Sequence, residues 1–300
     1  MEPTTLAFIG AGSMGRPMIR HLVAAGHRVL VSVRRPEARA AVESLGAVPV
    51  DSPAVAARDA SFVLTNVTTT GDVEEVLLGA AGAAGTARRG TLCIDFSTIS
   101  PLATRDIAAR LEAQGLSLLD APVSGGVRGA EAATLSIMVG GSTADLARAR
   151  PLLAVLGRVI THVGPAGAGQ VAKACNQIVQ VVNIEGIAEA MHFATALGAD
   201  PHRVLTAISA GMAGSKMLDL MGPKMADRDF AAGIEARLHA KDFGLVAEVA
   251  ARAGLDLPAV ARVRVQLDRL VGLGWGRDDT SSLLRVLEAG DPAREPDAGE

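Results

Sequence analysis

The chain has 300 residues, of which 49% are hydrophobic and 20% charged, the composition of an ordinary globular protein with room for two domains. Its 29 basic and 32 acidic residues give a net charge of −3, and it contains six Phe, one Trp and no Tyr. We therefore expect neither nucleic acid nor a membrane surface as a partner, because those would need basic or aromatic patches.

Short β-branched runs alternate with Ala-rich helical runs through the first half of the chain. The predicted strands are 5–9, 28–33, 61–66, 91–95, 116–120, 135–139 and 159–162. The predicted helices are 13–25, 36–45, 53–57, 72–78, 101–114 and 143–154. Alternation at these lengths predicts βαβ units and a parallel sheet.

Strand signals stop after Gly169, and long helical patterns follow. The predicted helices are 167–197, 201–211, 216–225, 235–253, 258–271 and 279–288. The first would span about 45 Å at 1.5 Å per residue, enough to join two domains. We predict an α/β domain over 1–164, an all-α domain over 165–290 and a frayed tail over 291–300. The long apolar helices also predict a homodimer or homotetramer.

Compartment and metal content follow from weaker signals. The N-terminus has no basic segment followed by an apolar one, so we expect no signal peptide and a cytoplasmic protein. Cys93 and Cys175 lie in apolar stretches without a second Cys or a His at metal-ligand spacing. We interpret them as small hydrophobic residues in a reducing compartment, and we expect no metal. Polar residues interrupt the apolar stretch 177–199, which favours a buried helix over a membrane span.

The first strand leads into a glycine motif of the form G-x-G-x-x-G. Gly10 permits a tight turn, Gly12 lets the backbone approach phosphates, and Gly15 lets the next helix pack close to the sheet. The helix N-terminus then offers free N–H groups to an anion. The motif predicts a Rossmann-type dinucleotide site formed by Gly10, Ala11, Gly12, Ser13, Met14 and Gly15.

The end of the second strand bears on the choice of nucleotide. An acid at this point would bind the ribose hydroxyls of NAD, but Arg34 and Arg35 stand here instead. A guanidinium can bind a 2′-phosphate that a carboxylate would repel. We therefore predict NADP, with NAD possible if the two arginines are only solvated loop residues.

Three further segments carry candidate chemistry. Ser124-Gly125-Gly126 follows a strand and can present a hydroxyl and consecutive N–H groups to a carboxylate; the alternative is a tight turn. Lys173 lies in an apolar helix and shares a face with Asn176. It is either a proton-transfer group or a lysine whose aliphatic chain is buried while its ammonium group reaches solvent. Lys241-Asp242 fits a site or a solvated helix face.

Four segments, in order, resemble the β-hydroxyacid dehydrogenase family, which includes 3-hydroxyisobutyrate dehydrogenases and tartronate semialdehyde (2-hydroxy-3-oxopropionate) reductases. They are Phe8–Met18, Asp120–Gly126, Gly167–Asn176 and Lys241-Asp242, and the resemblance covers residues 5–288.

The resemblance implies a role for each matched residue. Lys173 would be the general acid or base. Ser124, Gly125, Gly126 and Asn176 would bind a small carboxylate-bearing substrate. Asn66, Val67, Thr98 and Lys241 would contact the cofactor.

The implied activity is NADP-dependent hydride transfer between a small β-hydroxyacid and its semialdehyde. Glyoxylate or succinate semialdehyde reduction remains an alternative. An imine reductase is disfavoured because that class usually lacks the lysine, and a non-catalytic cofactor-binding module is disfavoured because Lys173 and Asn176 are both present. Two residues stay open: Arg128 either recruits a second anion or faces solvent, and Trp275 either caps the pocket or fills a surface groove.

Overall fold

The computed structural model describes residues 2–33, 35 and 37–290. It divides into two compact units, Met1–Lys173 and Ala174–Glu300. Arg34 and the tail 291–300 lie outside the described residues.

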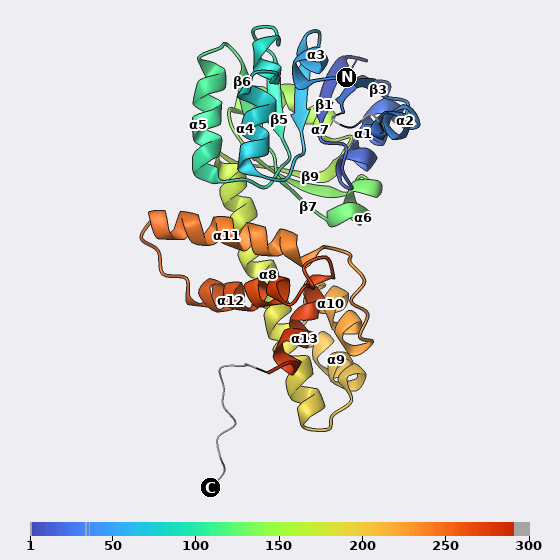
Figure 1. The fold of residues 1–300 in the computed structure, drawn as a ribbon, viewed down its shortest axis with the longest axis vertical. Coiled ribbons are helices and arrows are strands. Elements are labelled where there is room, and N and C mark those ends of the chain that lie inside the picture. Colours follow the sequence, from blue (N-terminus) through green and yellow to red (C-terminus); the bar gives the residue numbers. More distant parts are fainter. Residues whose placement is uncertain (1, 34, 36, 291–300) are drawn as a thin grey trace. The chain divides into compact units, whose positions relative to one another are not determined.

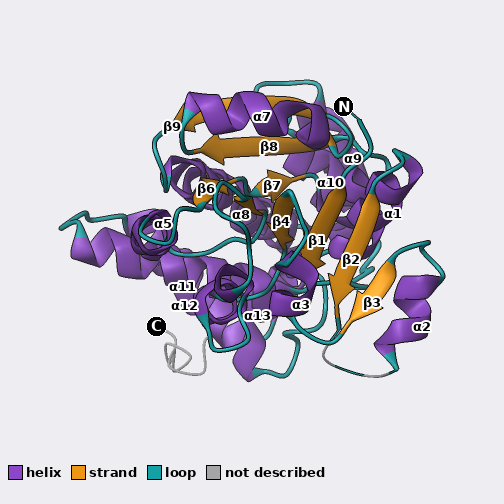
Figure 2. Cartoon of the chain, turned by 90° about the horizontal axis from the view of Figure 1, so that it is seen from above, coloured by secondary structure: helices purple, strands orange, loops and turns teal. Residues whose placement is uncertain are grey.

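The first unit is built on a nine-stranded sheet (Figures 1 and 2). Its strands are β1 (Thr5–Ile9), β2 (Arg28–Ser32), β3 (Val48–Val50), β4 (Phe62–Thr65), β5 (Leu92–Asp95), β6 (Ser117–Asp120), β7 (Val123–Ser124), β8 (Leu135–Gly140) and β9 (Gly157–Gly164). The spatial order is β3-β2-β1-β4-β5-β6-β8-β7, and β9 pairs with β8. The six strands from β3 to β6 are parallel, in the order typical of a dinucleotide-binding fold.

Helices cover both faces of this sheet. They are α1 (Gly15–Ala24), α2 (Ala38–Glu43), α3 (Pro53–Ala57), α4 (Thr70–Leu78), η1 (Ala83–Gly85), α5 (Pro101–Glu112), α6 (Gly126–Glu131) and α7 (Thr143–Leu153). Because side chains alternate along a strand, Leu6 and Phe8 of β1 pack into one apolar core with α1 and α7. Ala7 and Ile9 point the other way, into a second core with α3, α4 and α5.

The second unit is helical. Its elements are α8 (Ala168–Ala196), whose first turn and a half belong to the first unit, α9 (Pro201–Ser209), α10 (Lys216–Ala226), α11 (Ala236–Arg252), α12 (Pro258–Gly272), η2 (Thr280–Ser282) and α13 (Leu283–Glu288). A third apolar core joins them, and it includes Ile184 and Met191 of α8, Phe243 of α11 and Leu267 of α12. No helix in the described part of the chain is both long and apolar enough to cross a membrane.

The predicted fold class is confirmed, with three local differences. β8 runs antiparallel to β6 and β7, so the sheet is mixed rather than all parallel. Between β6 and β8 the chain reverses direction through β7 and the short α6, where a parallel pairing would need a crossover connection. The two short strands β3 and β7 and the helix α6 were not predicted. The predicted helix 279–288 begins as the 3₁₀ turn η2.

Candidate active site

The glycine motif forms the turn between β1 and α1. Gly10 has φ +112°, and a Cβ built there would lie 2.1 Å from the carbonyl oxygen of Asn66. A Cβ on Gly15 would lie 1.9 Å from the carbonyl oxygen of Gly10. Chain packing therefore requires both glycines, whereas a Cβ on Gly12 would meet nothing within 4 Å. The middle of the turn is open to an approaching group.

The N-terminus of α1 has the electrostatics of an anion site. Its cap residue, Met14, makes no side-chain capping hydrogen bond, and the first turn holds no acid. Ser13 is exposed, and Arg16 Nε donates to the carbonyl oxygen of Ala11 at 3.2 Å. The helix dipole, the N–H groups of the first turn and this guanidinium all favour a negative group beside the turn. These features fit a pyrophosphate.

The ends of β4 and β5 are held together by a buried carboxylate. Asp95 Oδ1 accepts from Thr65 Oγ1 at 2.8 Å and from the Ser97 N–H at 3.0 Å. Ser97 Oγ in turn accepts from the Val67 N–H at 2.9 Å. Burial raises the pKa of Asp95 above its usual value. Since strand register places Ile9 beside Thr65, this network lies at the same sheet edge as the glycine turn.

A second buried carboxylate anchors the helix that carries Lys173. Asp120, at the end of β6, accepts from the Gly167 N–H at 2.8 Å and from the Gln170 N–H at 2.9 Å. Its side chain is fully buried, and burial raises its pKa although these backbone bonds oppose the shift. A Cβ on Gly169 would lie 2.6 Å from the carbonyl oxygen of Asp120. The first turn of α8 is thus pressed against the end of β6.

Gln170 connects this turn to the loop after β5. Its Nε2 donates to the Ser97 carbonyl oxygen at 2.8 Å, and its Oε1 accepts from the Ile99 N–H at 3.1 Å. Thr98 lies between those two residues. The same side chain therefore fixes the Thr98 loop against the turn of α8 that precedes Lys173.

The predicted substrate loop lies where β7 leads into α6. Ser124 pairs with Ser136 of β8, and Gly125 and Gly126 follow with φ of +134° and +61°. Both values lie in the left-handed region that glycine adopts without strain. Arg128 is exposed on α6.

Lys173 and Asn176 occupy successive turns of α8. Lys173 is 8% exposed. Asn176 is half-buried, and its Nδ2 donates to Gln177 Oε1 at 2.9 Å and to Gln180 Oε1 at 3.1 Å. The 3.6-residue repeat places Lys173 and Asn176 on neighbouring parts of one face. Backbone geometry thus keeps the proposed proton donor and the amide together.

A polar chain in the second unit links Asn176 to Lys241 of α11. Gln177 accepts from Asn176, and its Nε2 donates to Asp242 Oδ2 at 2.6 Å. Asp242 Oδ1 lies 3.0 Å from Lys241 Nζ. Asp242 and Gln177 are both buried. The Lys241-Asp242 pair is therefore tied to α8 rather than being only a solvated helix face.

The predicted site residues thus fall into two groups, one in each unit. The first unit contains the glycine turn, Asn66, Val67, Thr98, the Ser124–Gly126 loop and Lys173. The second contains Asn176 and Lys241. Arg35 lies three residues after the end of β2, the strand that pairs with β1, and its side chain is exposed. Arg34 lies outside the described residues.

Sequence reasoning missed the supporting residues Asp95, Gln170 and Gln177. Polar residues within strand ends and apolar helices were visible in the sequence, but their partners lie 30 to 73 residues away.

Two other features belong to the second unit. The Trp275 ring packs on the helical core, with the Arg285 guanidinium 3.8 Å from the ring centroid.

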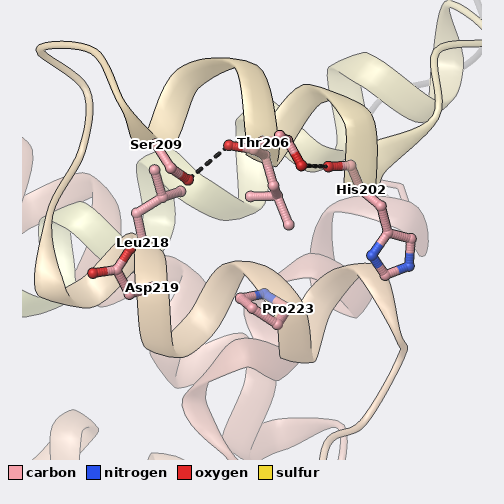
Figure 3. A pocket seen from close by; sticks show the side chains of 7 residues that line it. His202, Thr206, Ser209, Leu218, Asp219 and Pro223 are labelled. Carbon is pink, nitrogen blue, oxygen red and sulfur yellow. Dashed lines mark hydrogen bonds between the residues drawn. The ribbon is translucent and has the colours of Figure 1, made fainter.

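A hollow of about 310 Å³ lies between α9 and α10 (Figure 3). Its lining is His202, Leu205, Thr206, Ser209, Leu218, Asp219 and Pro223. The Thr206 and Ser209 hydroxyls donate to carbonyl oxygens of their own helix.

Comparison with known proteins matches most of the described chain. A family model for the NAD-binding domain of 6-phosphogluconate dehydrogenase matches residues 5–164. A second, described as the NAD-binding domain of NADP-dependent 3-hydroxyisobutyrate dehydrogenase, matches residues 167–287.

Individual relatives extend the match over nearly the full length. 2-Hydroxy-3-oxopropionate reductase of Escherichia coli (strain K12) is 40% identical, over 94% of this chain and 97% of its own. NAD-dependent L-serine dehydrogenase of Pseudomonas aeruginosa is 37% identical, over 94% and 97%. The structure of Mycobacterium tuberculosis 3-hydroxyisobutyrate dehydrogenase with L-serine is 35% identical, with a TM-score of 0.89, over 95% of this chain and 99% of that one.

Proposed function

The chain belongs to the 3-hydroxyisobutyrate dehydrogenase family of NAD(P)-dependent β-hydroxyacid oxidoreductases, and we propose that it interconverts a small β-hydroxyacid and its semialdehyde with NADP(H). The observation that carries the proposal is Lys173, a buried lysine on a helix whose first turn is fixed by Asp120. We infer a substrate of the tartronate semialdehyde or methylmalonate semialdehyde type, in line with the activities for which the relatives are named.

The chemistry divides between Lys173 and the groups around it. When bound, the nicotinamide cofactor supplies the hydride. Lys173, as an ammonium, donates a proton to the substrate carbonyl oxygen as negative charge develops there, and in oxidation its amine accepts the hydroxyl proton. The Asn176 amide exchanges its hydrogen bond to Gln180 for one to the substrate. The Ser124 hydroxyl and the N–H groups of Gly125 and Gly126 bind the carboxylate.

The cofactor-binding residues follow the edge of the sheet. The open turn at Gly12 and the N-terminus of α1 receive the pyrophosphate. Asn66, Val67 and Thr98, held by the Asp95 and Gln170 networks, contact the nicotinamide half. Asp242 pairs with Lys241, which we assign to cofactor binding.

The reaction is tested by following NADPH absorbance with a panel of carbonyl compounds. The panel is tartronate semialdehyde, methylmalonate semialdehyde, succinate semialdehyde, glyoxylate and a cyclic imine. We expect Lys173→Ala to reduce kcat by about a hundredfold or more, because it removes the proton donor. NADPH binding, measured by calorimetry, should change little. The matched control is Lys216→Ala, an exposed lysine on α10. Unchanged turnover in Lys173→Ala on the best acid substrate would refute the assignment.

Asp120 is proposed as a positioning residue for Lys173. In Asp120→Asn, the new amide NH₂ faces one of the two backbone N–H donors, so the first turn of α8 loses an anchor. We expect kcat to fall about tenfold and its pH profile to shift, with the KM for NADPH nearly unchanged. Asp145→Asn, at the N-terminus of α7, is the control. An unaltered pH profile would leave Asp120 a purely structural role.

Arg34 and Arg35 are proposed to bind the 2′-phosphate of NADP. The matching family model is named for an NADP-dependent enzyme and one relative for an NAD-dependent enzyme, so the preference has to be measured on this chain. Arg35→Ala should raise the KM for NADPH at least fivefold more than that for NADH, since a charged hydrogen bond contributes roughly 1.5–3 kcal/mol. Arg39→Ala, whose guanidinium pairs with Asp51 at 2.7 Å, is the control. Equal effects on both cofactors would exclude a phosphate contact.

A further inference from the structure

The carboxyl edge of the parallel sheet holds two neighbouring acids. Asp95 ends β5, Asp120 ends β6, and the strand register pairs the two residues directly. Neighbouring strands lie about 4.8 Å apart, and these side chains are only 1% and 0% exposed. Two carboxylates this close repel each other in a buried site, so one of them keeps a proton when the other is ionised. The hydrogen-bond donors around each acid decide which one.

The surroundings of Asp120 favour a carboxylate. Its Oδ1 accepts from the Gly167 N–H at 2.8 Å, and its Oδ2 accepts from the Gln170 N–H at 2.9 Å. Both donors lie at the start of α8, a 29-residue helix whose dipole favours negative charge at this end. Backbone N–H groups can only donate, so a proton on either oxygen would face a donor and break a hydrogen bond. Burial raises the pKa of Asp120, but these backbone bonds oppose the shift.

The surroundings of Asp95 favour a neutral acid. Thr65 Oγ1 and the Ser97 N–H both donate to Asp95 Oδ1, at 2.8 and 3.0 Å. Oδ2 is buried and has no hydrogen-bond partner among the described residues. An ionised Asp95 would leave charge on that oxygen without a donor, whereas a protonated one presents Oδ1 as a carbonyl oxygen and carries the proton on Oδ2. Burial raises the pKa of Asp95, and the charge of Asp120 adds to the shift.

We propose that Asp95 holds the proton of this pair and, as a neutral acid, positions the two loops assigned to the nicotinamide half of the cofactor. Its Oδ1 joins Thr65, the last residue of β4, to Ser97 in the loop after β5. The Ser97 hydroxyl accepts from the Val67 N–H at 2.9 Å, which extends the link to the loop after β4. Asp95 is a positioning residue, because it acts on the cofactor through Val67 and the Thr98 loop.

Ionisation of Asp95 loosens these loops, because two buried carboxylates side by side repel each other and draw in water. Titratable groups face Asp95 from two strands, the Cys93 thiol from β5 and the Asp120 carboxyl from β6. Burial raises the pKa of Cys93 to about 12, so the thiol stays neutral. β4 presents a hydroxyl, and α8 presents the Gln170 amide to the loop after β5. Lys173, three residues beyond Gln170, also titrates, so the test compares variants that share it.

Cofactor binding then depends on pH with a definite sign. The pKa of Asp95 is raised in the folded chain, so the proton is held at low pH and is lost as the pH rises through the raised value. When binding requires the protonated form, the Kd of the cofactor rises by up to about tenfold per pH unit above that point. The inference rests on the cofactor site of the proposed function and is independent of the substrate.

Calorimetry of cofactor binding from pH 6 to pH 9.5 tests the proposal, with NADPH or NADH, whichever binds more tightly. The wild-type Kd should rise toward the alkaline end. Asp95→Asn keeps the Oδ1 acceptor and cannot ionise, so its Kd at pH 6 should stay within about threefold of wild type and should lack that rise. Asp106→Asn, at an exposed acid on α5, is the matched control and should follow the wild type. A wild-type pH profile in Asp95→Asn, or binding about tenfold weaker than wild type at pH 6 in a folded variant, would overturn the proposal.

Infrared spectroscopy reads the proton directly, and it needs no variant that has to fold. In wild-type chain labelled with ¹³C-aspartate, the carbonyl stretch of a protonated aspartic acid should be present at pH 6 and should disappear over the pH range in which the Kd rises. Where Asp95→Asn folds, as circular dichroism shows, it should lack this band, and Asp120→Asn should keep it. An absent band in the wild type, or a band lost only in Asp120→Asn, contradicts the assignment. These readouts use no substrate, so they stand apart from the fate of the proposed reaction.

Discussion

Glu185 of α8 gives a stability prediction with a definite sign. Its side chain is 7% exposed in the helical unit, and its Oε2 has no hydrogen-bond partner among the described residues. Burial, with a smaller contribution from the charge of Glu189, raises the pKa of Glu185 from 4.5 to about 7. The folded chain therefore favours the protonated acid, while the unfolded chain ionises it at a lower pH.

The magnitude follows from linkage between protonation and folding. Because its pKa is raised in the folded chain, this carboxyl group does not change the free energy of unfolding well below pH 4.5. Above that pH it lowers the free energy of unfolding progressively, until the pH passes about 7. At 1.36 kcal/mol per pKa unit, the full cost is about 3 kcal/mol. Between pH 5 and pH 8, wild-type stability should fall by roughly 2–3 kcal/mol from this group alone. Glu185→Gln cannot ionise, so it should be the more stable chain at pH 8 and lose most of that advantage at pH 5.

Urea unfolding followed by tryptophan fluorescence measures this difference. The chain has one Trp, Trp275, which packs on the helical core, so its emission reports the second unit. The matched control is Glu288→Gln, because the Arg228 guanidinium pairs with Glu288 and lowers its pKa. That variant should lose stability at neutral pH, by at most about 1 kcal/mol for a surface pair. If Glu185→Gln shifts the unfolding midpoint equally at pH 5 and pH 8, Glu185 does not titrate between them and the reasoning is wrong.

Three further outcomes are expected. Gly15→Ala places a Cβ 1.9 Å from the Gly10 carbonyl oxygen, so it should lower stability by about 1–3 kcal/mol and weaken NADPH binding in calorimetry; wild-type affinity would contradict this. The Cys93 thiol, with a pKa raised to about 12 by burial, should resist alkylation at pH 8 until urea unfolds the chain, as mass spectrometry can show. Arg285→Ala removes the cation 3.8 Å from the Trp275 ring, so it should shift the fluorescence and cost about 1 kcal/mol in urea unfolding; an unchanged spectrum would exclude the contact.

Local signals in the sequence determined the elements and their type. Short apolar runs such as 5–9 and helix-starting prolines such as Pro101 and Pro201 lie within a residue of where the elements begin. The length of α8 followed from uninterrupted helical spacing, and the turn at Gly10 followed from the glycine motif. These features depend on neighbours a few residues away, which a sequence displays directly.

Tertiary structure decided which residues that are far apart in the sequence come into contact. The antiparallel direction of β8 depends on how the short segment after β6 turns back, and hydrophobic pattern does not encode that direction. Asp120 meets Gly167 across 47 residues, and Gln177 meets Asp242 across 65. Such partners are chosen by the packing of whole elements, because a buried polar group must find a hydrogen bond wherever the fold provides one. The lysine, the glycines and the asparagine could therefore be selected from the sequence, while the carboxylates and amides that hold them needed the fold.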